Sequence, residues 1–154
     1  MDKIYLGFEG LEVYKAARAF RRKISLIAKN FPKTEEYSLK SQIIRSSRSI
    51  SANIAEGYGR FHYQEFIQFC RQARGSLNET LEHLICANDE NYISEEQLND
   101  FRNDIQILLR LINGFINYLQ KQNVQSKQTA QSKKTTVQSN TTNTTSTTNT
   151  TSKP

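Results

Sequence analysis

A repeat of apolar residues between positions 98 and 119 constrains the fold of this chain more than any other feature. The repeat alternates steps of three and four, which places its side chains on one face of an α-helix. Residues 13–31, 39–54 and 66–84 show a related spacing, and no alternation of period two competes with it. The sequence therefore predicts an all-α protein with four helices. Their inner positions are Val13, Ala17, Phe20, Ile24, Ile27 and Phe31; Leu39, Ile43, Ser46, Ile50 and Ile54; Phe66, Cys70, Ala73, Leu77, Leu81 and Leu84; and Leu98, Phe101, Ile105, Leu108, Ile112, Phe115 and Leu119.

The link between the first two helices contains residues that end and begin helices. Pro32 ends the first helix, because proline cannot donate the next backbone hydrogen bond and disfavours helix at the residue before it. Thr34 is a good N-cap for the second helix, and Glu35 and Glu36 suit the positive end of its dipole. The sequence therefore predicts that the second helix begins near Thr34.

Similar signals separate the third and fourth helices. The third helix is expected to run from about His62 to Asn88. Asn91 tolerates the left-handed conformation that closes a helix, and Ser94 with Gln97 three residues later forms a capping box. With short connections throughout, the predicted fold is an antiparallel up-down four-helix bundle.

The last 32 residues differ from the rest in composition. Residues 123–154 contain 11 threonines and four lysines, with no acidic or aromatic residue. Such a segment has too little apolar surface to offset the entropy lost on ordering. We therefore predict a bundle over residues 1–122 and a disordered tail, rich in Thr, Asn, Ser and Lys, over residues 123–154.

The fourth helix is apolar around most of its circumference. Between residues 105 and 119, one narrow polar stripe holds most of the polar side chains. One bundle seam cannot cover so wide an apolar surface, so a helix of this kind is buried on several sides. We therefore predict a homo-oligomer in which outward residues such as Leu109 contact another subunit.

Charge is distributed unevenly along the chain. Residues 1–60 contain 12 Lys/Arg and 6 Asp/Glu, whereas residues 61–122 contain 5 and 9. A basic first half is suited to nucleic acid. It could equally pair with the acidic half of its own or a neighbouring chain, and composition alone favours that second interpretation.

Chemistry-bearing motifs are scarce. The two histidines, His62 and His83, lack the Glu-x-x-His pairs of a di-iron bundle, and no nucleophile elbow or phosphate loop is present. The sequence therefore predicts no catalytic residue, no metal site and no cofactor. Two cysteines without a Cys-x-x-Cys motif indicate buried thiols in a reducing compartment. Since the chain shows neither a secretory signal nor a run of 18 apolar residues, we expect a cytoplasmic protein that does not enter a membrane.

Basic residues recur at helical spacing on the first three predicted helices. Aromatic residues lie beside one of them, and arginine with aromatics is typical of surfaces that contact phosphates and bases. The alternative is that these residues form salt bridges between subunits or serve solubility. The candidate nucleic-acid-binding residues are Lys15, Arg18, Arg22, Arg45, Arg48, Arg60, Arg71 and Arg74.

Two segments resemble a known family. RSSRSISANIAEGYGR at 45–60 and EFIQFCRQARGSLNETLEHL at 65–84 are similar to the four-helix-bundle proteins encoded in intervening sequences of bacterial large-subunit ribosomal RNA genes. FEGLEVYKAA at 8–17 and NYI at 91–93 resemble its opening and one of its turns, with Asn91 in place of Gly. The resemblance implies a bundle that assembles as a homopentamer. It also implies kinship with the accessory variability protein of diversity-generating retroelements, which binds nucleic acid and a reverse transcriptase.

The end of the second helix contains polar residues and glycines within an apolar pattern. We predict that Glu56 pairs with a nearby arginine and that Asn53 binds backbone groups freed at the helix end, so that both hold the turn at 57–60. Gly57 and Gly59 let the chain reverse where a side chain would clash. Arg60 then emerges beside the third helix.

These features lead to one functional prediction and two alternatives. The preferred function is non-catalytic binding of structured RNA or RNA/DNA through a basic face of an oligomer, as an accessory factor to a nucleic-acid enzyme. The alternative is a protein-only scaffold whose basic face pairs with acidic surface between subunits. A hydrolase or nuclease ranks last, because no metal or nucleophile cluster is present.

Overall fold

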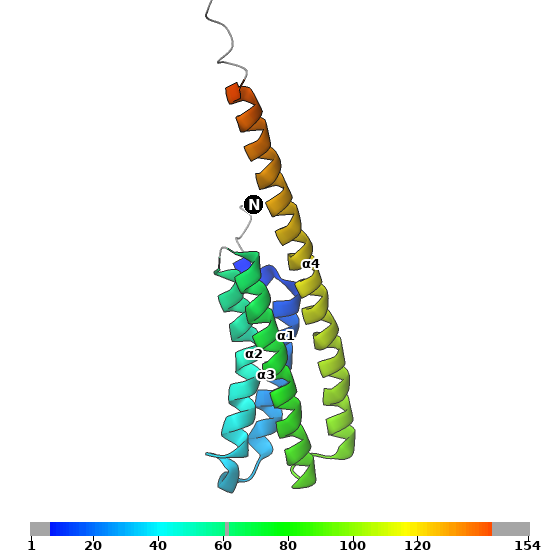
Figure 1. The fold of residues 1–154 in the computed structure, drawn as a ribbon. Helices are drawn as coiled ribbons and strands as arrows, with labels where there is room; N and C mark the ends of the chain where they lie inside the picture. Colours follow the sequence, from blue (N-terminus) through cyan, green and yellow to red (C-terminus); the bar gives the residue numbers. More distant parts are fainter. Residues whose placement is uncertain (1–6, 61, 143–154) are drawn as a thin grey trace, which may run out of the picture. The chain divides into compact units, whose positions relative to one another are not determined.

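Four long helices make up the computed structural model, which describes residues 7–60 and 62–142, with side chains to residue 132 (Figure 1). They are α1 (Glu12–Ile27), α2 (Leu39–Tyr58), α3 (Tyr63–Asp89) and α4 (Glu95–Thr142). Short 3-10 helices cover Gly7–Gly10, Ala28–Asn30 and Lys33–Glu35, and the described residues contain no strand. The all-α prediction with four helices is confirmed. The chain divides into two units, residues 1–120 and 121–154, which are described separately.

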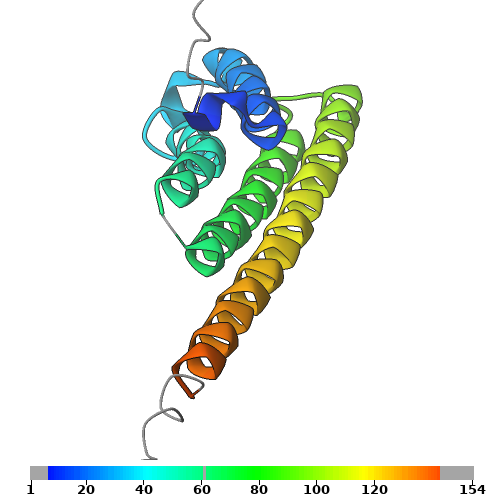
Figure 2. The same ribbon diagram turned by 90° about the horizontal axis from the view of Figure 1, so that it is seen from above.

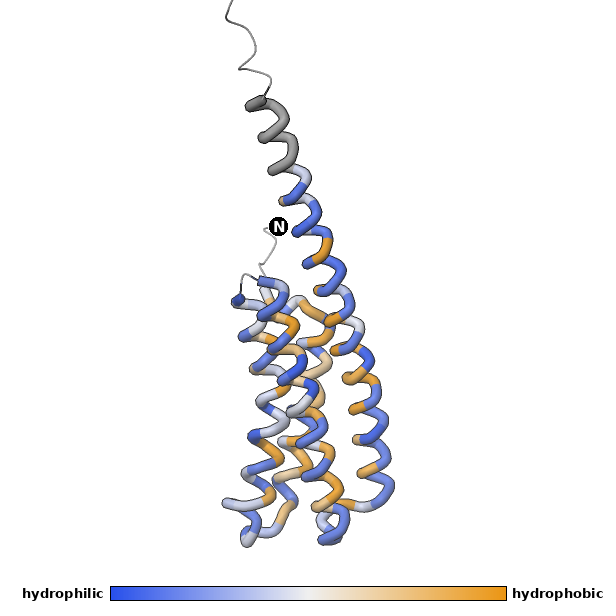
Figure 3. The backbone as a smooth tube through the Cα atoms, in the orientation of Figure 1, coloured by the Kyte–Doolittle hydropathy of each residue, from blue (hydrophilic) through white to orange (hydrophobic). Residues whose placement is uncertain are grey.

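The core of the first unit is made from the predicted apolar seams. Figures 1 and 2 show α1, α2 and α3 side by side, and Figure 3 shows hydrophobic positions recurring along each helix. Nearly every predicted inner position is buried. Thr80 and Ile116 are also buried, although neither was predicted. The exceptions are half-buried and pack against the core: Ile27, Leu39, Leu81 and Phe115.

The start of α2 corrects the predicted N-cap at Thr34. The helix begins at Leu39, and residues 33–35 form a 3-10 turn instead. A carboxylate oxygen of Glu35 accepts the backbone N–H of Leu39 at 3.1 Å and the hydroxyl of Ser38. Because Glu35 satisfies a free donor at the helix start, the Thr34 hydroxyl is not needed there. These hydrogen bonds, the one from Ser38 first, lower the pKa of Glu35.

The turn between α3 and α4 confirms the predicted left-handed Asn91 and the predicted capping box of Ser94 and Gln97. Asn91 has a φ of 60°, in the left-handed region. The backbone N–H of Ser94 donates to Gln97 Oε1 at 2.9 Å, and the N–H of Gln97 donates to Ser94 Oγ at 3.1 Å. This reciprocal pair is the predicted capping box.

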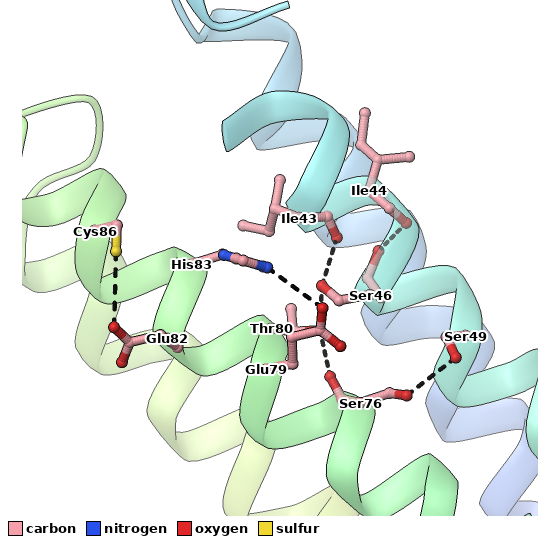
Figure 4. Close-up of polar contacts among 11 residues, drawn as sticks. Ile43, Ile44, Ser46, Ser49, Ser76, Glu79, Thr80, Glu82, His83 and Cys86 are labelled. Atoms are coloured by element: carbon pink, nitrogen blue, oxygen red, sulfur yellow. Dashed lines mark hydrogen bonds and ion pairs between the residues drawn. The ribbon is translucent and has the colours of Figure 1, made fainter. Parts of the chain in front are cut away.

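Helices α2 and α3 meet along a row of small polar side chains, shown in Figure 4. Thr80 donates to Ser46 at 2.9 Å, and Ser76 donates to Ser49 at 3.0 Å. The Ser46 hydroxyl also donates to a carbonyl of its own helix, that of Ile43. The small side chains bring the two backbones close, and the hydroxyl groups satisfy one another where water is excluded.

Helix α4 continues beyond the predicted start of the disordered tail. It is helical to Thr142, and the tail residues 143–154 lie outside the described residues. No glycine or proline interrupts residues 115–142, so the helix can extend one hydrogen bond at a time. Hydroxyl groups such as that of Ser126 donate to carbonyls in the preceding turn. Residues 125–132 are all exposed, so this stretch forms a helix without a buried face.

Gly57 supplies a stability test of the α2–α3 contact. A Cβ atom at Gly57 would lie 2.8 Å from Phe69 Cβ and 2.9 Å from Phe66 Cε2, closer than real Cβ contacts. Overpacking of this kind costs about 1–3 kcal/mol, more than the helix propensity that alanine adds. We expect Gly57→Ala to lower the free energy of unfolding by about 1–2 kcal/mol in urea denaturation.

Gly59 is the matched control. Its Cβ would lie 3.4 Å from the nearest atom, and its φ of −71° suits any residue. Gly59→Ala should therefore change the stability by less than about 0.5 kcal/mol. Equal stability of the Gly57→Ala variant and the natural chain would contradict the close packing.

Candidate nucleic-acid interface

The predicted basic residues fall into two groups according to their partners. Three are held by other side chains, at 2.7 Å for Lys15 with Glu12, 2.8 Å for Arg60 with Glu56 and 2.9 Å for Arg74 with Asn113. The others form no ion pair with any described residue and are exposed: Arg18, Arg22, Arg45, Arg48 and Arg71. An unpaired, exposed guanidinium is available to bind a phosphate.

On α1, the free cations lie on the side away from the core. Ala17, Phe20 and Ile24 are buried, whereas Arg18 and Arg22 are exposed. Residues 15, 18 and 22 follow the three-and-four spacing of one helix face. The structure therefore places Lys15, Arg18 and Arg22 on one exposed face, which we name the α1 basic face.

On α2, two arginines share a shallow groove. Arg45 and Arg48 line it together with Ser41 and Lys40, beside Ile44 and Glu36. We name this surface the α2 groove. Lys40 Nζ lies 2.5 Å from a Glu36 carboxylate oxygen. Sequence reasoning missed Lys40 and Ser41, although the spacing of four residues between Ser41 and Arg45 could have indicated Ser41.

Arg71 and Arg74 have different surroundings despite their spacing of three. Arg74 is half-buried and donates to Asn113 Oδ1 of α4 at 2.9 Å. Arg71 is exposed and makes no ion pair with the described residues. Arg74 therefore joins α3 to α4, whereas Arg71 is free to contact a partner.

The turn at 57–60 agrees with the prediction in part. Glu56 Oε1 accepts from Arg60 Nη2 at 2.8 Å, and the Arg60 guanidinium lies 5.2 Å from the centre of the Phe69 ring. The predicted role of Asn53 is wrong, because its amide donates to the carbonyl of Ser49 at 2.9 Å, within α2. The Ser49 carbonyl lies one helical turn before Asn53 and accepts from its amide, so the Asn53 side chain does not extend to residues 57–60.

The surface between α1 and α4 contains exposed apolar side chains. Leu26 is 63% exposed, Ile107 is 53% exposed and Tyr118 is 54% exposed. Further apolar residues line the shallow grooves between these helices, so we name this surface the α1–α4 apolar face. Leu109, which was predicted to point outward, is instead half-buried and packs on the core. The grooves also contain Leu11, Ala16, Ala19, Leu111, Gly114 and Phe115.

An ion pair crosses the α1–α4 apolar face. Lys23 Nζ lies 2.6 Å from Asp104 Oδ2 and 4.8 Å from the centre of the Phe101 ring. A lysine held by a carboxylate and an aromatic face is poorly available to phosphate. Lys23 is therefore not one of the free cations of α1.

The titratable groups do not assemble into a reactive cluster. His62 is exposed, and His83 is 15% exposed with Nε2 3.7 Å from Glu79 Oε1 and no hydrogen bond. Burial raises the pKa of Cys70 to about 12. Within the part of the chain that the structure describes, no group of three His, Cys, Asp or Glu side chains could hold a metal ion. Nor does any described helix have the length and hydropathy to span a membrane.

The fold and these surfaces define a helical-bundle protein with exposed, unpaired arginines and exposed apolar side chains. The model of the 23S rRNA-intervening sequence protein family matches residues 9–114, so the chain belongs to that family. The resemblance noted in the sequence is thereby confirmed. A solved structure from Bacteroides thetaiotaomicron, described as a protein with unknown function from the S23 ribosomal protein family, is similar at a TM-score of 0.62 and 28% identity. The alignment covers 68% of this chain and 97% of that one. No curated protein matches this chain.

The contrast between Arg71 and Arg74 can be measured. We expect Arg74→Gln to lower the free energy of unfolding by about 1 kcal/mol, because it removes a charged hydrogen bond and leaves Asn113 unpaired. Arg71→Gln should stay within about 0.5 kcal/mol of the natural chain. Urea denaturation of both variants checks this, and equal effects would contradict the assignment of Arg74 as a helix-joining residue.

Proposed function

We propose that this protein binds structured RNA or RNA/DNA without catalysing a reaction, as an oligomer in the cytoplasm. The observation that carries the proposal is the set of exposed, unpaired arginines on the α1 basic face and in the α2 groove. Helices α1 and α2 pack against each other, so the two basic surfaces belong to neighbouring helices.

Electrostatics supports a phosphate partner for these arginines. Three of the five acidic residues described in residues 7–60 already pair with a cation: Glu12, Glu36 and Glu56. The remaining cations repel one another, which costs free energy in the isolated chain. A polyanion relieves that repulsion and gains entropy by releasing condensed counterions.

The scaffold interpretation assigns the same cations to a second subunit. Residues 61–122 hold 9 acidic and 5 basic residues, and exposed carboxylates such as Glu65 and Glu82 could receive arginines from another chain. The two interpretations differ in one measurable respect, because removal of the arginines weakens nucleic-acid binding in the first and assembly in the second.

The proposed oligomer buries the α1–α4 apolar face against a second copy of the chain. Exposed Leu26, Ile107 and Tyr118 belong to this face, and Ala16 and Ala19 line a groove on it together with Ile107. Contiguous apolar surface of this kind marks protein–protein contacts. By its resemblance to the family, the oligomer is a homopentamer, and a ring would repeat the basic surfaces around its circumference. The same resemblance supports a role beside a nucleic-acid enzyme, such as a reverse transcriptase.

Salt dependence tests the proposed binding. We expect the affinity for a structured RNA to fall with salt, and Arg18→Gln with Arg22→Gln to lower the slope of log affinity against log salt by about 1.4–1.8. The physical reason is that each phosphate contact releases condensed counterions from the RNA, so a variant with fewer contacts releases fewer counterions on binding. Fluorescence anisotropy at several salt concentrations measures the slope.

The control is a double variant of α4, Arg102→Gln with Lys121→Gln, which removes two positive charges outside the α1 basic face and the α2 groove. It should change the slope of log affinity against log salt much less. Light scattering should show that the α1 variant keeps its assembly, because glutamine preserves helix propensity. No binding by the natural chain at about 50 mM salt, together with loss of assembly in the α1 variant, would replace this proposal with the scaffold interpretation.

Substitutions on α4 test the proposed assembly through the α1–α4 apolar face. Ile107→Asp places a charge on the α1–α4 apolar face, and we expect multi-angle light scattering to show smaller species while circular dichroism retains its helicity. Gln106→Asp adds the same charge at an exposed residue of the same helix that does not line the grooves of this face, so it is the matched control and should leave the mass unchanged. Assembly that is equally unaffected in both variants would show that this face is not the subunit contact.

A further inference from the structure

Tyr37 is the most exposed large hydrophobic side chain of the described residues. It lies in the turn before α2, and 96% of its surface is accessible. It makes no ring contact or hydrogen bond within the part of the chain that the structure describes. Nothing in the bundle therefore depends on this ring, and both of its faces are open.

The α2 groove is lined by residues on both sides of Tyr37 in the sequence. Glu36, the neighbour of Tyr37, lines the groove together with Lys40, Ser41, Arg45 and Arg48. From residue 39 to residue 48 the helix rises about 14 Å at 1.5 Å per residue. Tyr37 and the two free guanidinium groups are therefore carried by one short segment of the chain, residues 37–48.

Two carboxylates lie close to this surface, and both are occupied. Glu36 pairs with Lys40 at 2.5 Å. Glu35 accepts from the Ser38 hydroxyl, the Leu39 N–H and, at 3.3 Å, the Tyr92 hydroxyl. Residues 33–48 hold four basic and two acidic residues, so the surface keeps a positive charge that attracts phosphate.

We infer that Tyr37 and the α2 groove together bind unpaired nucleotides: a base stacks on the Tyr37 ring while Arg45 and Arg48 bind phosphates along the same strand. The inference rests on the proposed nucleic-acid binding and adds a preference to it. Stacking on an aromatic side chain needs a free base face. Bases inside a continuous duplex have no such face, so loops, bulges and single strands bind better than blunt duplex.

The test compares one single-stranded oligonucleotide with a blunt duplex of the same sequence, using fluorescence anisotropy on the full chain. The natural chain should bind the single strand more tightly. Tyr37→Ala should weaken binding of the single strand about 5- to 150-fold, the range of one stacked base, and leave the duplex within about twofold. Tyr37→Phe should bind as the natural chain does, because the ring face is kept.

Tyr63→Ala is the matched control, since Tyr63 is an exposed tyrosine on another helix. Equal weakening of single strand and duplex by Tyr37→Ala, or no weakening of either, would overturn the inference. A Tyr37→Phe variant as weak as Tyr37→Ala would also overturn it, because the hydroxyl and not the ring would then make the contact. If Arg18→Gln with Arg22→Gln still lowers affinity in those cases, the proposed function stands. If neither oligonucleotide binds, both proposals fail.

Discussion

The close approach of α2 and α3 is the contact on which the other surfaces depend. Gly57 lets the side chains of Phe66 and Phe69 approach the α2 backbone closely. In the same interface, Thr80 donates a buried hydrogen bond of 2.9 Å to Ser46. Helix periodicity then fixes the opposite side of α2 as its solvent side. Arg45 and Arg48 lie on that exposed side, so the packing of small residues on one face presents the charges on the other.

The cations of α1 differ in whether the bundle neutralises them. Where α1 faces α4, Lys23 is bound to Asp104 and lies over the Phe101 ring. The charge of Lys23 is thereby neutralised beside the exposed apolar side chains of Leu26 and Ile107. On the outer side of α1, Arg18 and Arg22 have no such partners among the described residues. One surface is suited to another protein chain and the other to a polyanion.

Local patterns predicted the fold well because the physics that they describe is local. The apolar seams, the left-handed Asn91 and the Ser94–Gln97 box each depend on residues within one or two helical turns, and each is confirmed. Thr34 failed as an N-cap because Glu35, one residue away, reaches the free N–H of Leu39. The helical stretch after residue 122 was missed because a lack of core-forming residues does not prevent an exposed helix.

By itself, the sequence determined which residues carry charge and on which side of its own helix each one lies, since helical periodicity needs nothing beyond the helix. Only the tertiary structure decided which charges are free. Arg71 and Arg74 have the same chemistry, yet Arg74 binds Asn113, which lies 39 residues away along the chain. Tyr37 is exposed for the same reason, because no distant segment covers it. The availability of a side chain is set by its neighbours in space, and only packing brings those neighbours together.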